Sequence, residues 1–360
     1  MKPTFHTLKV KEVRKETRDC CSIAFEIPEE LKLAYDFTQG QYLTLKKDIN
    51  NEDIRRSYSI CTSPNDDELR VAVKQVHNGK FSTFANHQLK AGDTLDVMTP
   101  MGNFYTELDP NQEKHYVGFA AGSGITPIIS IMKTVLETEP KSRFTLFYGN
   151  KNTGSIIFKE EIEALKNSYM ERLVVHYFLS REMLDAPLMN GRIDKEKCTA
   201  IFDTLLDVSE IDDCFSCGPE SMIFAVKDAL LERDFDEAKI HFELFTSPLG
   251  KLGVEKKIEV KETNKGKSSQ ITVNLDGKAF QFDLPFGTDN LLDAALKQGA
   301  DLPFACKGGV CCTCKAKIKE GTVDMALNYA LEKDEVEAGF ILTCQAYPTT
   351  DKVVIDFDEV

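Results

Sequence analysis

Four cysteines in the last sixth of the chain have a spacing that suits iron–sulfur chemistry. Three of them follow the pattern C-x4-C-x2-C, and the fourth comes after 29 further residues. Two irons bridged by two sulfides need four thiolates, two on each iron, and this is the spacing of the plant-type [2Fe–2S] cluster. Glycines at 308 and 309 would let the loop backbone approach the inorganic sulfides. The predicted metal ligands are Cys306, Cys311, Cys314 and Cys344.

A structural zinc site is the alternative for these thiols. Zinc sites normally use two closely spaced ligand pairs, whereas this stretch holds one C-x2-C pair and no histidine. The spacing therefore favours the cluster. Cys312 lies between two of the expected ligands, and we interpret it as a small buried bystander.

A glycine-rich turn in the middle of the chain is typical of nucleotide binding. An apolar strand over 114–121 runs into Gly122-Ser123-Gly124-Ile125-Thr126-Pro127, and apolar residues then recur at helical spacing. Such a turn lets a pyrophosphate approach the backbone at the positive end of a helix. Cys217-Gly218-Pro219 forms a second strand-to-helix junction, where a thiol beside a glycine can face a nicotinamide ring. A buried structural cysteine is the other interpretation of Cys217.

The choice between NADPH and NADH depends on one further pair of residues. Ser180 and Arg181 follow the third strand of this region, at the edge where ligands bind. A guanidinium there can pair with a ribose 2′-phosphate, although a solvated surface arginine is nearly as compatible with the sequence. We expect NADPH, with NADH less favoured.

The N-terminal region contains a candidate flavin site. In Arg55-Arg56-Ser57-Tyr58-Ser59, which we place at the start of a strand, Arg56 can pair with a flavin phosphate and Tyr58 can pack on the ring. Gly79-Lys80-Phe81-Ser82 opens a predicted helix whose N–H groups can face the pyrophosphate.

These motifs lie in three regions of different pattern. Short apolar runs broken by turn residues predict an antiparallel β-barrel over 1–108. Alternating strands and helices predict a parallel α/β sheet over 109–246. A charged linker over 247–269 then leads to an α+β domain of the β-grasp type over 270–360, which carries the four cysteines.

Charge and cysteine content restrict the partners. The formal net charge of −14 argues against a nucleic-acid partner, because phosphate binding needs clustered Lys and Arg. The sequence has no apolar run long enough for a signal peptide or a membrane span, so we expect a cytoplasmic protein that binds no membrane. In that compartment the eleven cysteines are not expected to form disulfides.

Taken together, the motifs resemble the ferredoxin–NADP reductase superfamily fused to a plant-type ferredoxin, over essentially the whole chain. The domain order is similar to that of reductase components of multicomponent oxygenases. More specifically, several stretches resemble reductase subunits of the phenylacetyl-CoA epoxidases of aerobic phenylacetate degradation: FSTFANHQL, AAGSGITPIISI, LFYGNKN, GRID, LPFACKGGVCCTCKAKIKEGTVDM and NYALEKDEVEAGFILTCQAYP. The chain has Gln39-Gly40-Gln41 where many relatives have Pro-Gly-Gln.

The resemblance implies FAD, NADPH and a di-iron oxygenase as the electron acceptor. Ser59, Cys217 and Glu243 are assigned to the reacting centre. The cofactor-binding residues expected for this chain are Arg56, Ser57, Tyr58, Ser59, Val73, Lys74, Gly79, Lys80, Phe81, Ser82, Gly122, Ser123, Gly124, Thr126, Pro127, Ser180, Arg181, Cys217, Gly218, Pro219 and Phe245.

Two other functions remain compatible with the sequence. One is a reductase for a different acceptor, such as an aromatic-ring or other oxygenase, a hybrid-cluster protein or a deoxysugar dehydrase. The other is a redox-sensing or zinc-binding interaction module without turnover, against which the paired nucleotide-binding turns argue.

Overall fold

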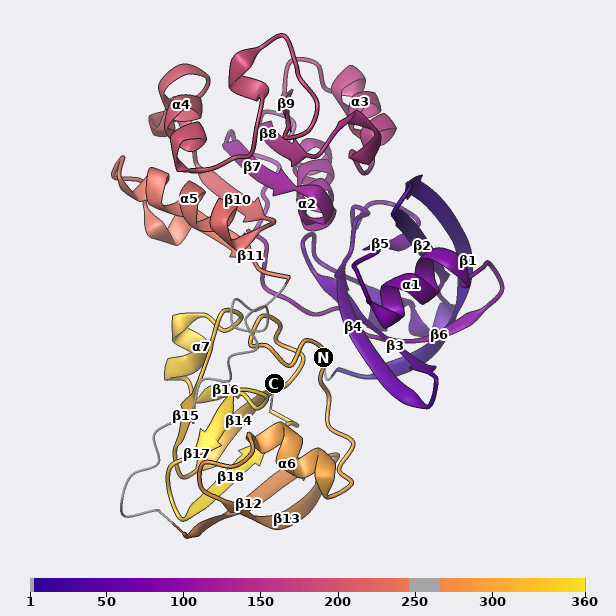
Figure 1. The fold of residues 1–360 in the computed structure, drawn as a ribbon, viewed down its shortest axis with the longest axis vertical. Helices are drawn as coiled ribbons and strands as arrows, with labels where there is room; N and C mark the ends of the chain where they lie inside the picture. Colours follow the sequence, from indigo (N-terminus) through magenta and orange to yellow (C-terminus); the bar gives the residue numbers. More distant parts are fainter. Residues whose placement is uncertain (1–2, 246–265, 360) are drawn as a thin grey trace. The chain divides into compact units, whose positions relative to one another are not determined.

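The computed structural model describes residues 3–245 and 266–359. They fall into two compact units (Figure 1). The first unit, within residues 5–245, holds two β-sheets, and the second, within residues 266–359, holds the remaining two.

The N-terminal sheet confirms the expected antiparallel barrel. Its six strands follow the order β4-β3-β6-β1-β2-β5, and a bridge between Ile60 and Val71 joins its two outer edges. Alternate side chains point inward to a core that includes Leu8, Leu43 and Val97. The elements are β1 (Phe5–Thr17), β2 (Cys20–Glu26), β3 (Tyr42–Ile49), β4 (Glu52–Ser59), β5 (Leu69–Lys74), α1 (Lys80–His87) and β6 (Thr94–Met98).

The expected position of the Arg55–Ser59 motif in its strand was wrong. The motif occupies the end of β4 rather than a strand start. The cause is the turn at Asn50 and Asn51, which both have positive φ, 57° and 61°. Two successive asparagines of this kind form the tight turn that suits a twisted hairpin, so β4 begins directly after them.

The second sheet of this unit confirms the expected parallel α/β arrangement. Its strand order is β11-β10-β7-β8-β9, and every neighbouring pair is parallel. Helices α2 and α3 pack on one face, and α4 and α5 cover the other. The elements are β7 (His115–Ala121), α2 (Ile125–Thr138), β8 (Arg143–Asn150), α3 (Lys159–Ser168), β9 (Leu173–Leu179), α4 (Lys195–Thr204), β10 (Asp213–Cys217), α5 (Glu220–Leu231) and β11 (Ile240–Glu243).

The barrel and the parallel sheet share a continuous core. Phe104, which follows the barrel, packs edge-on against Phe215 of β10 with ring centroids 5.6 Å apart. Buried Ser130 of α2 donates a hydrogen bond of 2.7 Å to the carbonyl oxygen of Thr62. These contacts hold the end of β4 close to the nucleotide-binding sheet.

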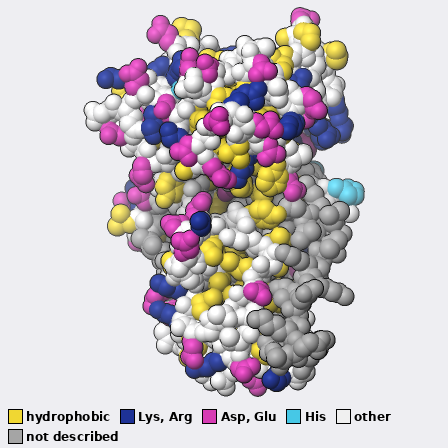
Figure 2. Space-filling model, turned by 90° about the vertical axis from the view of Figure 1, so that its left-hand side faces the viewer, with side chains coloured by type: hydrophobic (Ala, Val, Ile, Leu, Met, Phe, Trp, Pro, Cys, Tyr) yellow, Lys and Arg dark blue, Asp and Glu magenta, His cyan; other side chains and the backbone are white. Residues whose placement is uncertain are grey.

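Opposite charges are interspersed on the surface of α4 and α5. Ion pairs join Lys195 to Glu232 and Arg233 to Asp203, at 2.6 Å each. Figure 2 shows acidic and basic side chains mixed over the upper part of the visible face. The excess of acidic residues is therefore not segregated from the basic ones on this face.

The second unit has the mixed sheet expected of a β-grasp domain. Its strand order is β13-β12-β18-β14-β16, with β12 and β18 parallel and the other neighbours antiparallel. Asp276 and Gly277, both at positive φ, form the β12–β13 turn. The elements are β12 (Ser268–Leu275), β13 (Lys278–Pro285), α6 (Leu291–Lys297), β14 (Lys315–Glu320), β15 (Val323–Met325), α7 (Lys333–Glu337), β16 (Phe340–Leu342), β17 (Ala346–Pro348) and β18 (Lys352–Asp356).

Most of the expected linker over 247–269 lies outside the described residues. Strand β12 begins at Ser268, which is inside that expected linker. The short strands β14 to β17 and helix α7 were not expected from the sequence.

In the described parts of the chain, no helix combines the length and apolarity that crossing a membrane requires.

Candidate functional site

The candidate nicotinamide site lies where the order of the strands in the parallel sheet reverses. From β7 the chain proceeds through β8 to β9 on one side, and β10 and β11 lie on the other. In such sheets a crevice opens at this switch point, outside the carboxyl ends of the strands. Gly122–Gly124 follows β7 and Cys217–Pro219 follows β10, so the two turns flank the switch point.

Glycine is required where these turns meet. A Cβ on Gly124 would lie 2.0 Å from the carbonyl oxygen of Cys217, and one on Gly218 would lie 2.8 Å from the Cε of Met222. Gly122 has a φ of 55°, in the left-handed region. Gly124 is buried by this close approach, whereas Gly122 and Ser123 are partly exposed, so their backbone is open to a pyrophosphate.

Glu243 and Ser59 join the parallel sheet to the barrel at this same edge. Glu243 ends β11 in register with Cys217 of β10, and Ser59 ends β4. The Ser59 hydroxyl donates a hydrogen bond of 3.0 Å to Oε2 of Glu243. Burial raises the pKa of Glu243 to about 7, while the Ser59 hydrogen bond acts in the opposite direction. The three residues assigned to the reacting centre are thus brought together.

The Cys217 thiol is protonated in this environment. Its side chain is fully buried, and this burial raises the pKa of the thiol well above the ordinary value. The nearby Glu243 carboxyl raises the pKa further. A neutral thiol offers polarizable surface rather than a nucleophilic thiolate. The arrangement suits packing against a ring and does not suit covalent catalysis.

Of the β4 residues expected to bind flavin, Tyr58 contacts the start of α1. The Tyr58 ring lies 5.5 Å from the Phe81 ring, centroid to centroid. The Ser82 hydroxyl accepts a hydrogen bond of 3.2 Å from the backbone N–H of Val76, so it fixes the turn that leads into the helix. Gly79 is the N-cap, and Lys80 pairs with Glu52 across the surface.

The other expected flavin-binding residues differ in how much of their side chain is open to a ligand. Phe81 and Val73 are buried in the barrel core, which leaves only their backbone for a ligand. Lys74 ends β5 and points toward the Gly122 turn: its Nζ would be 3.8 Å from a Cβ added to Gly122. The Arg56 guanidinium donates a hydrogen bond of 2.7 Å to the carbonyl oxygen of Arg55. The Phe245 side chain is 40% exposed. Ser57 lies in β4 between Arg56 and Tyr58.

The remaining nucleotide residues occupy the positions that the motifs predict. Thr126 and Pro127 lie in the first turn of α2, and the Thr126 hydroxyl donates to the Ser123 carbonyl oxygen at 3.0 Å. Ser180 and Arg181 follow β9, which is the outermost strand on that side of the sheet.

In the second unit, hydrogen bonds bring the distant cysteine to the cysteine-rich loop. Thr343 donates to the carbonyl oxygen of Cys314 through its hydroxyl at 2.9 Å and through its N–H at 3.2 Å. Cys344 is the next residue. Thr343 was missed by the sequence analysis, since no local pattern distinguishes this threonine from an ordinary strand-end residue.

The four expected ligand thiols, three from the loop and Cys344 from after β16, contact one another. Hydrogen bonds from the Cys311 and Cys344 thiols, and from the N–H groups of Gly308 and Val310, lower the pKa of Cys306 well below its ordinary value. Cys344 also contacts Cys314. Gly309 has a φ of 73°, and a Cβ added at this position would lie 3.0 Å from the Leu327 carbonyl oxygen. A loop that stabilises a thiolate among converging thiols fits a [2Fe–2S] cluster.

Cys312 points away from this group. Its thiol donates to the carbonyl oxygen of Ala330 at 3.1 Å. No disulfide joins any of the eleven cysteines. Within the described residues, no three His, Cys, Asp or Glu side chains surround a single ion position.

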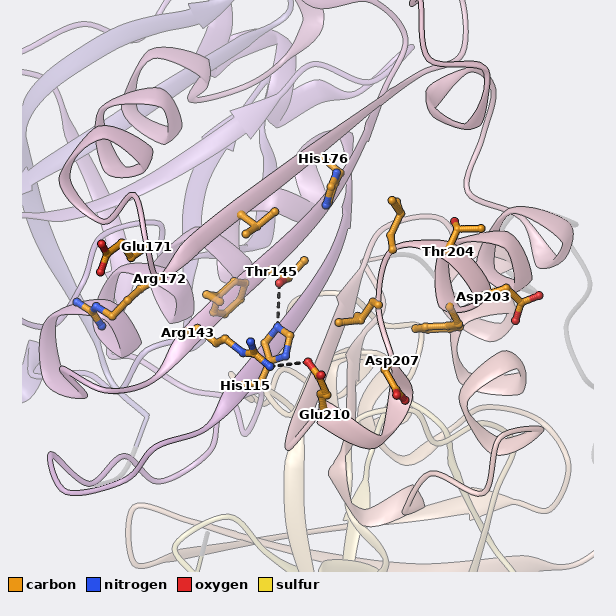
Figure 3. A pocket seen from close by; sticks show the side chains of 15 residues that line it. His115, Arg143, Thr145, Glu171, Arg172, His176, Asp203, Thr204, Asp207 and Glu210 are labelled. Atoms are coloured by element: carbon orange, nitrogen blue, oxygen red, sulfur yellow. Dashed lines mark hydrogen bonds and ion pairs between the residues drawn. The ribbon is translucent and has the colours of Figure 1, made fainter.

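A cavity of the parallel sheet lies at the opposite edge, at the amino ends of its strands. It has a volume of about 700 Å³ and is lined by residues from the amino ends of β7, β8 and β9 and from the end of α4 (Figure 3). Its polar lining includes His115, whose Nε2 is 2.8 Å from Oγ1 of Thr145, and the Arg143–Glu210 ion pair. None of the predicted cofactor residues lines this cavity.

Comparisons with known proteins agree with this arrangement. Family models match an oxidoreductase FAD-binding domain at residues 7–105, an oxidoreductase NAD-binding domain at 119–228 and a 2Fe-2S iron-sulfur cluster binding domain at 273–349. The E component of the 1,2-phenylacetyl-CoA epoxidase of Escherichia coli (strain K12) is 44% identical, with 99% of this chain and 98% of that protein covered. The chain belongs to the family of oxygenase reductase components.

Other relatives show that the family serves different oxygenases. The ferredoxin reductase component of 3-ketosteroid-9-alpha-monooxygenase from Rhodococcus rhodochrous is 34% identical, over 97% of this chain and 96% of that protein. Among solved structures, phthalate dioxygenase reductase has the same fold, with a TM-score of 0.58, 22% identity and 98% of both chains covered. Membership of this family means that the chain is an NAD(P)H-, FAD- and [2Fe–2S]-dependent oxidoreductase.

Proposed function

We propose that this chain is the reductase of a phenylacetyl-CoA epoxidase and delivers electrons from NADPH to a di-iron oxygenase component. The observation that carries the proposal is the 44% identity to the E. coli epoxidase component across all three modules. The identity to the steroid monooxygenase reductase is lower, at 34%.

Each cofactor has a set of residues that would hold it. The Gly122–Gly124 and Cys217–Pro219 turns would bind the nicotinamide nucleotide, and the end of β4 with the start of α1 would bind FAD. Cys306, Cys311, Cys314 and Cys344 would ligate the cluster. When bound, FAD accepts a pair of electrons as hydride and releases them singly to a [2Fe–2S] centre.

The chain itself contributes positioning and exclusion of water. Ser59 and Glu243 join the two cofactor-binding parts at the carboxyl edge of the sheet. Cys217 supplies a neutral, fully buried surface beside them. No side chain of this group has to act as a nucleophile, because the electron chemistry belongs to the cofactors. We also propose that the protein works in the cytoplasm, where the cysteines outside the cluster loop stay reduced.

The proposal is tested by pairing the purified holoprotein with alternative oxygenase components. Phenylacetyl-CoA-dependent NADPH oxidation and epoxide formation should be supported by the epoxidase oxygenase. The oxygenase of a 3-ketosteroid-9-alpha-monooxygenase should be reduced at least about tenfold more slowly, a discrimination of about 1.4 kcal/mol. Equal or faster turnover with the steroid oxygenase would overturn the assignment of the acceptor.

A further inference from the structure

Tyr148 of β8 is a buried tyrosine whose hydroxyl contacts the glycine turn that follows β7. Its side chain has no exposed surface, and burial raises the pKa of the phenol, so the hydroxyl keeps its proton. The hydroxyl lies 3.0 Å from the carbonyl oxygen of Gly122 and 3.5 Å from that of Ile157. Because a phenol has a single proton to donate, the closer carbonyl of Gly122 receives it.

This contact sets the direction of the peptide group between Gly122 and Ser123. In a trans peptide the C=O and N–H bonds point in opposite directions. The Gly122 carbonyl points to the buried Tyr148 hydroxyl, so the Ser123 N–H points away from it. Gly122 and Ser123 are both partly exposed. The Ser123 N–H is therefore directed to the side of the turn that is open to a ligand.

The peptide group needs such a contact because glycine leaves it free to turn. Gly122 has a φ of 55°, and a glycine reaches negative φ about as readily. The Ile125 N–H also donates to the Gly122 carbonyl oxygen, and the Tyr148 hydroxyl adds a second hydrogen bond from a different strand. Two donors hold the carbonyl in one direction, and they polarise the peptide group so that its N–H becomes a stronger donor.

A cation lies beside the same turn. The Nζ of Lys74 would be 3.8 Å from a Cβ added to Gly122, and the Lys74 side chain is 19% exposed. Its ion pair with Asp19 is long, at 3.9 Å. An ammonium group and an outward N–H at the start of a helix both favour an anion. The pyrophosphate of the nicotinamide nucleotide is the anion that the proposed function brings to this turn.

We propose that Tyr148 is a positioning residue for binding of the pyrophosphate. It contacts no ligand atom itself. It holds the Gly122 carbonyl inward, so that the Ser123 N–H is presented to a phosphate oxygen. This role rests on the proposed binding of the nicotinamide nucleotide at the Gly122 turn. Since NADPH and NADH share the pyrophosphate, Tyr148 acts equally on both donors.

The test measures binding of adenosine 5′-diphosphate and of adenosine to the holoprotein by equilibrium dialysis, without turnover. Tyr148→Phe removes only the hydroxyl and keeps the buried ring. It should weaken binding of the diphosphate about fivefold, the size of one hydrogen bond, and should change binding of adenosine by less than about twofold. In steady-state reduction of ferricyanide, KM should rise by the same factor for NADPH and NADH, while kcat stays the same.

Tyr116→Phe is the matched control for general damage to the fold. Tyr116 lies in the neighbouring strand β7, has no exposed surface, and donates to the Glu139 carboxylate at 3.0 Å. Its loss should lower the stability to urea but leave the affinity for the diphosphate unchanged. Equal weakening in both variants, equal weakening of both ligands by Tyr148→Phe, or no weakening at all would overturn the role of Tyr148.

The same measurements separate this role from the proposed function. A wild-type protein that prefers NADH, with the expected effect of Tyr148→Phe, would support the role of Tyr148 and overturn the proposed use of NADPH. A wild-type protein that binds the diphosphate no more tightly than adenosine would overturn both the role of Tyr148 and the pyrophosphate site at the Gly122 turn.

Discussion

Ser59 and Glu243 are 184 positions apart in the sequence, and their side chains form a hydrogen bond of 3.0 Å. Ser59 ends barrel strand β4, and Glu243 ends β11 of the parallel sheet. This contact joins the two parts of the chain that bind the flavin and the nicotinamide nucleotide. Since Glu243 is in register with Cys217 of β10, the contact lies at the switch point of the sheet.

The raised pKa of Glu243 predicts a specific pH dependence of stability. The folded-state pKa of about 7 exceeds the ordinary value of 4.5, so folding favours the protonated carboxyl. The stabilisation is complete below about pH 4.5 and is lost as the pH rises through about 7. Relative to Glu243→Gln, the wild type should therefore lose on the order of 2 kcal/mol between pH 5 and pH 8, measured by thermal or urea unfolding.

Ser59→Ala is the matched variant for this measurement. The Ser59 hydrogen bond lowers the pKa of Glu243, so its removal should move the loss of stability to higher pH. Parallel pH profiles for the wild type and Glu243→Gln would contradict the assignment of this titration to Glu243.

Gly124→Ala should separate nucleotide binding from flavin binding. The added Cβ would lie 2.0 Å from the Cys217 carbonyl oxygen, so the α2 turn and the Cys217 turn must move apart. We expect the affinity for adenosine 5′-monophosphate to fall at least about tenfold while the FAD content is retained. Calorimetry and absorbance measure the two quantities.

Gly149→Ala provides the control for that prediction. It lies in β8 of the same sheet, and its Cβ would meet no atom closer than 3.6 Å. Unchanged nucleotide affinity in Gly124→Ala, or an equal loss in both variants, would show that the close approach at the switch point has no role in binding.

Local patterns predicted the parallel sheet well and the barrel motif less well. The runs in β7 and β8 are mostly apolar because helices cover both faces of the sheet, and this made them easy to recognise. In β1, by contrast, exposed charged residues alternate with buried ones such as Leu8 and Val10, and the strand was not expected. The start of β4 depends on the Asn50–Asn51 turn, which was not predicted from the sequence.

The residues of the site were easier to predict than their contacts. Glycine turns and cysteine spacing are local in sequence, so both were found. The Ser59–Glu243 hydrogen bond and the Thr343 contacts with Cys314 each connect separate segments, and only the tertiary fold brings them together. The expected strands also omitted β16, which has three residues and precedes Cys344.

Serine substitutions should distinguish the cluster ligands from the neighbouring thiol. Cys344→Ser should lose iron and the paramagnetic signal of the reduced protein while FAD and NADPH-dependent reduction of ferricyanide are retained, because the flavin lies in another domain. Cys312→Ser should keep the iron, since Cys312 faces the Ala330 carbonyl oxygen. Iron analysis and electron paramagnetic resonance measure the outcome. Equal loss of iron in both variants would contradict the ligand assignment.

Lys133 should stabilise the junction between barrel and sheet. Its ammonium group contacts Asp66 at 2.6 Å and Glu161 at 3.1 Å, and its side chain is 11% exposed. Lys133→Met leaves two carboxylates without their partner and should lower the unfolding free energy by about 2 kcal/mol. Lys166→Met removes a 3.4 Å pair that is 35% exposed on the lysine side, and it should cost less than about 0.5 kcal/mol. Similar losses in urea unfolding would contradict the role of Lys133.

Anaerobic titration of the holoprotein with NADPH, followed by absorbance and by electron paramagnetic resonance, tests the account of electron transfer most directly. We predict that the flavin absorbance bleaches and that a reduced [2Fe–2S] signal develops in the same chain, with two irons per protein. Bleaching of the flavin without any such signal, or zinc in place of iron, would contradict electron transfer from the nicotinamide through to the C-terminal domain.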